Sequence, residues 1–211
     1  MLVKVTLELL AGFRYNLIVF FATLVFAIPL GMVITFGEMS PIRPIRAFFR
    51  LAVWLIRGMP LMLQLFIVLY VPGLVFGMPF RQRLTAALIA FSVNYAAYFA
   101  EIYRGAIESI PPGQWEAGKV LGLSRSKVFF HIILFQVVRR SLPALGNEFI
   151  TLVKDTSLAR VIAVPEMLMK ATEFTMKGLI WPLFYSGLFY LVATAALEVL
   201  FKRLERRFAH G

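Results

Sequence analysis

The stretch LIVFFATLVFAIPLGMVITF, residues 17–36, decides the class of this protein. It carries no charged side chain, and it is as long as the run of about 20 apolar residues that a helix needs to cross a bilayer core. Pro29 and Gly31 lie inside it, and membrane helices tolerate both residues better than soluble helices do. The stretch predicts a transmembrane helix, which we expect to cover residues 8–36.

The composition agrees with a membrane protein. The chain has 211 residues, of which 60% are hydrophobic and 16% charged, with a mean hydropathy of +0.81 and a net charge of +11. A basic soluble protein would suggest nucleic acid as a partner, but here the basic residues flank apolar runs, as membrane topology requires. Cysteine is absent, and His131 and His210 are too far apart in sequence for a metal cluster. We therefore expect no nucleic acid partner, no metal site and no catalytic residue.

Four further apolar segments predict four more transmembrane helices, at residues 51–72, 83–105, 137–157 and 178–201. The second is interrupted by Arg57-Gly58-Met59-Pro60, and we expect residues 43–50 before it to form a short loop. Residues 106–128 mix charges with Pro111-Pro112-Gly113, which predicts a turn and a short surface helix. No secretory signal pattern precedes the first span, so we expect that span to be permanent. Residues 1–211 are thus interpreted as one all-α integral membrane domain.

An odd number of spans places the termini on opposite sides of the membrane. The basic segments at Arg43–Arg50, Arg104–Arg140 and from Lys202 onward all fall on one side, which the positive-inside rule assigns to the cytoplasm. The N-terminus is then outside and the C-terminus cytoplasmic. The bias is imperfect, because the outer side keeps Arg81, Arg83, Arg160, Lys170 and Lys177.

The short cytoplasmic helix has the properties of a docking element. Trp115, Ala117, Val120 and Leu121 form an apolar stripe that lipid cannot cover if the helix projects into water, so it needs a groove in a partner. Ala117 and Gly118 are small enough for close approach, and Gly122 suits a left-handed C-cap. The alternative is an ordinary amphipathic helix lying at the membrane surface.

The spacing in this segment resembles the loop shared by permeases of ABC importers, in which E-A-A is followed at fixed distances by G and by I-x-L-P. Glu116, Ala117, Gly122, Ile132 and Leu134 match, whereas Gly118 and Phe135 depart from the pattern. The chain also resembles polar amino acid permeases in four other places, namely Arg57-Gly58-Met59-Pro60-Leu61 with Gln64, residues 94–101, Gly113-Gln114-Trp115-Glu116 and residues 154–158.

This resemblance implies the type I importer permease fold, with five spans and a coupling helix, in a bacterial inner membrane. It implies alternating access through a pair of permeases, identical or paralogous, with a solute-binding protein outside and two ATPase subunits inside. The residues expected to couple to the ATPase are Trp115, Glu116, Ala117, Gly118, Leu121 and Gly122. No G-x-x-x-x-G-K-[ST] phosphate loop occurs in the chain, so ATP and magnesium are expected in the partner.

The fourth span carries the candidate substrate contacts. Glu148, Thr151 and Asp155 are spaced i, i+3 and i+7 and share one helix face, while Asn147 adds an amide. Ionisable groups within a span usually face a bundle interior or an aqueous cavity, and two carboxylates suit an ammonium or guanidinium group. Alternatively, Asp155 pairs with a basic neighbour or lies at the membrane edge, and Glu148 forms a hydrogen bond with a neighbouring helix.

Residues 142–148 look most like permeases for arginine, histidine and related basic amino acids, including lysine. Two other functions remain open, namely an ABC permease for another small polar solute and an ATP-independent secondary transporter.

Overall fold

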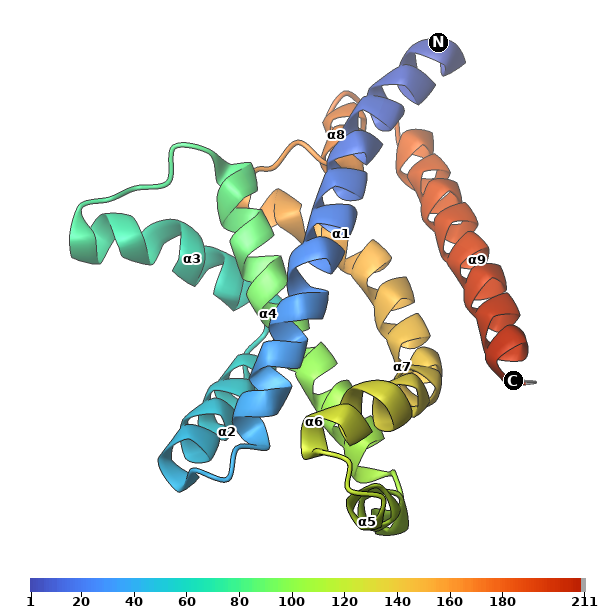
Figure 1. Ribbon diagram of the computed structural model, residues 1–211. Helices are drawn as coiled ribbons and strands as arrows, with labels where there is room; N and C mark the ends of the chain where they lie inside the picture. The colour runs from blue at the N-terminus through green and yellow to red at the C-terminus, as the bar shows by residue number, and fades with distance from the viewer. Residues whose placement is uncertain (210–211) are drawn as a thin grey trace.

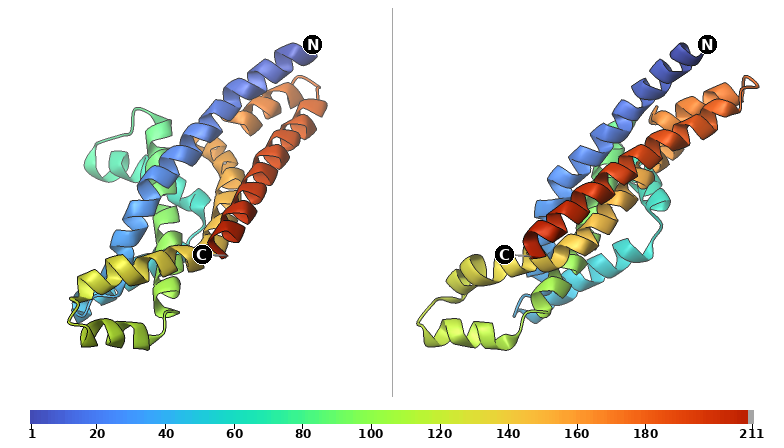
Figure 2. Two further views of the ribbon diagram at one scale, coloured as in Figure 1. Left: turned by 45° about the vertical axis from the view of Figure 1, so that its right-hand side comes forward. Right: turned by 90° about the vertical axis from the view of Figure 1, so that its right-hand side faces the viewer.

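The computed structural model describes residues 1–209, and all regular secondary structure in that range is helical. His210 lies outside the described residues. In chain order the helices are α1 (Leu2–Glu38), α2 (Arg43–Gly58), α3 (Leu61–Phe76), α4 (Arg83–Glu108), α5 (Pro112–Val120), α6 (Arg125–Val128), the π-helical η1 (Phe129–Ile133), α7 (Leu134–Asp155), the 3-10 helix η2 (Thr156–Ile162), α8 (Met167–Thr175) and α9 (Trp181–Ala209). Residue 1 and α8 lie at one end of the molecule and α5 at the other, with the described end of α9 in the half nearer α5 (Figures 1 and 2).

Four helical segments of the described chain are long and apolar enough to cross a membrane, at Leu2–Glu38, Arg83–Glu108, Arg125–Ile162 and Trp181–Phe208. The bent pair α2–α3 makes a fifth if it is counted as one span. These segments agree with the expected all-α membrane fold, although most extend beyond the predicted boundaries. With 37 residues, α1 is about 55 Å long and exceeds the thickness of a bilayer core, about 30 Å.

The second span differs from the prediction in two ways. Residues 43–50 are not a loop but the first half of α2, in which Pro44 occupies the first turn, where no backbone N–H is needed. Residues 51–72 do not form one helix, because α2 and α3 meet at an angle of 108° around Met59 and Pro60. Pro60 cannot donate the backbone hydrogen bond that would continue α2. The second span is therefore a broken helix.

A glutamine side chain satisfies the backbone at this break. Gln64 Nε2 donates to the carbonyl oxygens of Ile56 and Met59 at 2.6 and 3.0 Å. Its Oε1 accepts from Asn94 Nδ2 at 3.2 Å, which ties the break to α4. Non-helical backbone at membrane depth needs such partners, because lipid offers none.

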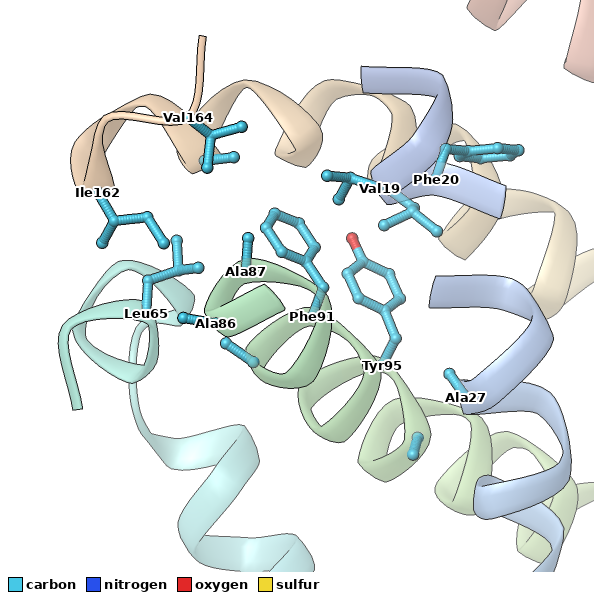
Figure 3. Packing of buried hydrophobic residues seen from close by; sticks show 14 of the residues in the cluster. Val19, Phe20, Ala27, Leu65, Ala86, Ala87, Phe91, Tyr95, Ile162 and Val164 are labelled. Atoms are coloured by element: carbon cyan, nitrogen blue, oxygen red, sulfur yellow. The ribbon is translucent and has the colours of Figure 1, made fainter. Parts of the chain in front are cut away.

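The core of the molecule lies where α1 crosses α4. Small residues bring these helices together, since a Cβ on Gly31 would lie 2.9 Å from the Phe99 side chain, and Ala96 is fully buried. Thr35 Oγ1 donates to the carbonyl of Ala100 across the interface at 3.1 Å. The labelled core residues come from α1, α3, α4, η2 and the segment after η2, and they include Phe91, Tyr95 and Val19 (Figure 3). This packing positions the α4 side chains that form the site described next.

Candidate functional site

A cavity of about 460 Å³ lies between the α2–α3 break, α4 and the end of α7. Its wall contains Arg57, Gly58, Met59, Pro60, Leu61, Asn94, Tyr95, Tyr98, Glu148, Thr151, Asp155 and Leu158. We call it the central cavity. Glu148, Thr151 and Asp155 all line it, as expected for residues that share one helix face. Asn147 is exposed and does not line it, because the next position along the helix points about 100° away.

The two carboxylates of the central cavity have different surroundings. The hydroxyl of Tyr95 donates a hydrogen bond to Asp155 Oδ2 at 2.8 Å. Within residues 1–209, Glu148 has no hydrogen bond or ion pair. Lys154, next to Asp155 in sequence, is exposed and makes no ion pair with it in the described chain. Within residues 1–209 neither carboxylate makes an ion pair, although Arg57 acts on Glu148 and Lys154 on Asp155 at longer range. The α7 side of the cavity can therefore accept a cationic group.

Arg57 contributes positive charge to the same cavity. Its Nη1 lies 3.5 Å from Glu101 Oε2, and its guanidinium lies 5.1 Å from the ring centroid of Tyr98. Glu101 also accepts from Arg104 Nη2 at 2.6 Å. The positive charge of Arg57 is thus held by α4 rather than by the carboxylates of α7. The cavity wall therefore carries acidic groups on α7 and a basic group on α2.

The short helix α5 ends as the glycine pattern predicts. Gly122 has φ +72°, a left-handed conformation that suits glycine. The N–H of Gly122 donates to the carbonyl of Lys119 and the N–H of Leu123 to that of Gly118, both at 3.0 Å. These two bonds make a Schellman cap, which terminates α5 sharply.

The residues expected to couple to the ATPase lie on two different faces of α5. Glu116, Ala117, Val120 and Leu121 are exposed, and Val120 and Leu121 keep 86% and 75% of their surface accessible. The helix α5, which carries this exposed set, lies at the end of the molecule and projects beyond the other helices (Figures 1 and 2).

Trp115 and Gly118 instead face the protein, so the predicted stripe that included Trp115 is wrong in this respect. The Trp115 ring stacks on Phe129 with centroids 6.5 Å apart, and Arg125 lies 5.6 Å above it. Gly118 is buried, and a Cβ at this position would overlap the Val128 side chain. The small size of Gly118 therefore serves packing within the chain, a contact that sequence spacing could not reveal.

A second group of buried polar side chains, missed at the sequence level, joins α1, η2, α8 and α9. Asn16 Nδ2 lies 3.0 Å from Thr156 Oγ1, 3.2 Å from Glu166 Oε2 and 3.0 Å from the Tyr190 hydroxyl, and Asn16 Oδ1 accepts from the N–H of Met167 at 3.0 Å. Glu166 is fully buried and caps α8. Burial raises its pKa above the ordinary glutamate value, although the hydrogen bonds that it accepts oppose the shift.

Comparison with known proteins places these features in context. The L-cystine transport system permease protein TcyB of Bacillus subtilis (strain 168) is 42% identical over 170 residues, which cover 80% of this chain and 71% of that protein. The arginine ABC transporter permease protein ArtQ of Escherichia coli (strain K12) is 37% identical over 123 residues, or 57% of this chain and 51% of that protein.

The fold resembles that of a solved transporter along nearly its whole length. A chain in the crystal structure of an amino acid ABC transporter with histidines superposes with a TM-score of 0.88 at 31% identity, covering 98% of this chain and 96% of that one. The expected ABC importer permease fold is confirmed. Residues 10–210 match the family "Binding-protein-dependent transport system inner membrane component", and the chain therefore belongs to that family of transporter membrane subunits.

Proposed function

We propose that this chain is the permease subunit of an ABC importer for amino acids with a cationic side chain, such as arginine, histidine or lysine. The observation that carries the proposal is the pair Glu148 and Asp155 in one cavity without a basic partner on either. Such a pair is costly within a membrane segment unless it faces water or binds a cation. The names of the relatives, which include amino acid, cystine and arginine transporters, support the amino acid class.

The other wall of the central cavity suits the backbone carboxylate of an amino acid. Arg57 lies at the end of α2, and α3 begins beside it at Leu61, with its positive dipole end at the cavity. A volume of about 460 Å³ falls in the usual range for small-molecule pockets. A basic amino acid bound between these walls would place its side chain near Glu148 and its carboxylate near Arg57. Thr151 lies between the carboxylates along α7 and offers a hydroxyl to the same ligand.

Coupling to ATP is assigned to the exposed face of α5. Val120 and Leu121 would be an unfavourable apolar surface in water, and Glu116 beside them provides a charge for an ATPase groove. In this proposal two permease subunits form the path and a solute-binding protein delivers the amino acid from outside. ATP and magnesium bind the ATPase dimer, so this chain transports without hydrolysing ATP.

The proposed orientation places the α5 end in the cytoplasm of a bacterium and the N-terminus outside the inner membrane. The basic residues at Arg43–Arg50 and in the segment 202–207 support this orientation, because both segments belong to the α5 half of the molecule (Figure 1).

Uptake into proteoliposomes tests the substrate. The complex should be reconstituted with ATP inside and the binding protein outside, and offered labelled L-arginine, L-histidine, L-lysine, L-glutamine and L-cystine. We expect basic amino acids to be taken up and Glu148→Gln to reduce their uptake at least tenfold, which equals about 1.4 kcal/mol. Glu198→Gln is the matched control, since Glu198 is an exposed residue of α9. Unchanged uptake by Glu148→Gln refutes the assignment.

Cystine is a second candidate substrate. The chain shares 42% identity with a cystine permease, and a cavity holding both Arg57 and two carboxylates matches a molecule with ammonium and carboxylate groups at both ends. Preferential uptake of L-cystine over L-arginine in the same assay would favour this candidate.

A further inference from the structure

Arg57 divides its contacts between the central cavity and the neighbouring helix α4. The residue lines the cavity, but its Nη1 lies 3.5 Å from Glu101 Oε2, and its guanidinium lies 5.1 Å from the centroid of the Tyr98 ring. Tyr98 lines the same cavity, whereas Glu101 does not. The guanidinium is therefore held at the edge of the cavity by a carboxylate that lies outside the proposed substrate site.

The two α4 contacts of Arg57 follow one another along the helix. Tyr98 and Glu101 are three residues apart, so they share one face of α4 and are separated by about 4.5 Å along its axis. Arg57 lies in the last turn of α2, next to the α2–α3 break, and 40% of its side chain is exposed. A change of rotamer in this long side chain can move the guanidinium from Glu101 to a ligand carboxylate beside Tyr98.

Glu101 does not depend on Arg57 alone to balance its charge. Its Oε2 also accepts from Arg104 Nη2 at 2.6 Å, a shorter contact than the one with Arg57. Arg104 in turn pairs with Glu108 at 2.9 Å. A partly buried carboxylate without any cation is costly, but Glu101 retains Arg104 when Arg57 leaves. The pair of Arg57 and Glu101 can therefore open at low cost.

We propose that Glu101 is a positioning residue that competes with the substrate carboxylate for Arg57. Without substrate, Glu101 holds the guanidinium at the cavity edge. With substrate, the carboxylate of the amino acid replaces Glu101 as the partner of Arg57, and Glu101 takes the guanidinium back when the substrate leaves. The competition lowers the affinity of the site for the carboxylate end of its ligand. This inference rests on the proposed function, in which Arg57 receives that carboxylate.

The competition predicts that neutralising Glu101 strengthens the carboxylate contact. L-arginine and L-argininamide have the same side chain, but the amide has no carboxylate. Equilibrium binding to the purified permease–ATPase complex gives a Kd for each, and the Kd of the amide divided by that of L-arginine measures the carboxylate contact. We expect Glu101→Gln to raise this Kd ratio about threefold, within the range that a partly exposed ion pair contributes.

Glu108→Gln is the matched control. Glu108 lies on the same helix and pairs with Arg104, but it makes no ion pair with Arg57. The substitution removes the same charge and should leave the Kd ratio unchanged. A Kd ratio for Glu101→Gln that is equal to or below the wild-type ratio overturns the proposal.

Arg104→Gln tests the competition in the opposite direction and does not require Glu101→Gln to fold. Without Arg104, Glu101 holds Arg57 more firmly, so the Kd ratio should fall about twofold. In the double variant with Glu101→Gln this fall should disappear, because Arg104 acts through Glu101. A general loss of structure would weaken both ligands together and leave their ratio unchanged. A ratio for Arg104→Gln that is not below wild type, or a fall that persists in the double variant, contradicts the proposal.

Arg57→Gln distinguishes this inference from the proposed function. If wild type binds L-arginine no better than L-argininamide, or Arg57→Gln keeps the wild-type Kd ratio, the proposed contact between Arg57 and the carboxylate fails, and the role of Glu101 fails with it. If Arg57→Gln lowers the Kd ratio while Glu101→Gln leaves it at the wild-type value, the role of Glu101 fails alone.

Discussion

Replacing Asn16 by alanine should destabilise the protein strongly, although Asn16 lies outside the central cavity. The side chain is 3% exposed. Its amide has two hydrogens for Glu166, Thr156 and Tyr190, and its oxygen accepts from the N–H of Met167. One bond to a charged group contributes about 2 kcal/mol, and each of two neutral bonds about 1 kcal/mol. The expected loss of unfolding free energy is therefore about 4 kcal/mol.

Thermal unfolding of the purified complex in detergent measures this loss. For a chain of about 200 residues, each kcal/mol shifts the melting temperature by about 2–4 °C, so Asn16→Ala should melt roughly 8–16 °C lower. Asn147→Ala is the matched control, since Asn147 is exposed, and its effect should remain within about 0.5 kcal/mol. A shift for Asn16→Ala no larger than that of Asn147→Ala would refute the reasoning, because it would mean that the buried hydrogen bonds contribute nothing.

Three further substitutions probe other contacts. Gln64→Leu removes the donor to the two carbonyls at the α2–α3 break and should lower the unfolding free energy by about 2 kcal/mol. An unchanged melting temperature would show that Gln64 does not stabilise the break. Gly118→Ala places a Cβ against Val128 and should lower the melting temperature. Overpacking costs about 1–3 kcal/mol of unfolding free energy, which outweighs the gain of about 1 kcal/mol in helix propensity. Adding Val128→Ala to Gly118→Ala should restore the melting temperature. A higher melting temperature for Gly118→Ala alone would disprove the clash. Burial raises the pKa of Glu166, so the folded state binds the carboxyl proton more tightly than the unfolded state does. The protonated Glu166 therefore contributes its full stabilisation below the ordinary glutamate pKa. That stabilisation is lost as the pH rises through the raised pKa of the folded state. Glu166→Gln should therefore remove part of the fall in melting temperature that occurs as the pH rises above the ordinary glutamate pKa, and identical pH profiles for the two proteins would exclude this linkage.

Much of the architecture could be predicted from local patterns. Apolar runs long enough to span a bilayer predict α1 and α9, because lipid requires such length whatever the neighbouring helices are. The spacing of Glu148, Thr151 and Asp155 predicted one shared face, and all three line the central cavity. The left-handed cap at Gly122 followed from the unique freedom of glycine.

Other features depend on contacts between distant segments. The interruption at Met59-Pro60 was visible in the sequence, but the 108° angle depends on Gln64 and Asn94 joining the break to α4. Thr156 belongs to the stretch Lys154–Leu158 that resembles amino acid permeases, and it is a buried partner of Asn16. Part of that resemblance therefore reflects packing.

The sequence by itself determined the membrane class, the number of apolar segments and the shared face of the α7 carboxylates, since hydropathy and helical periodicity are properties of neighbouring residues. Only the tertiary structure decided that Arg57 contacts Glu101 of α4, and that Trp115 and Gly118 face inward. Burial and charge pairing arise when helices that are distant in sequence pack together. A one-dimensional pattern contains the side chains but not their neighbours.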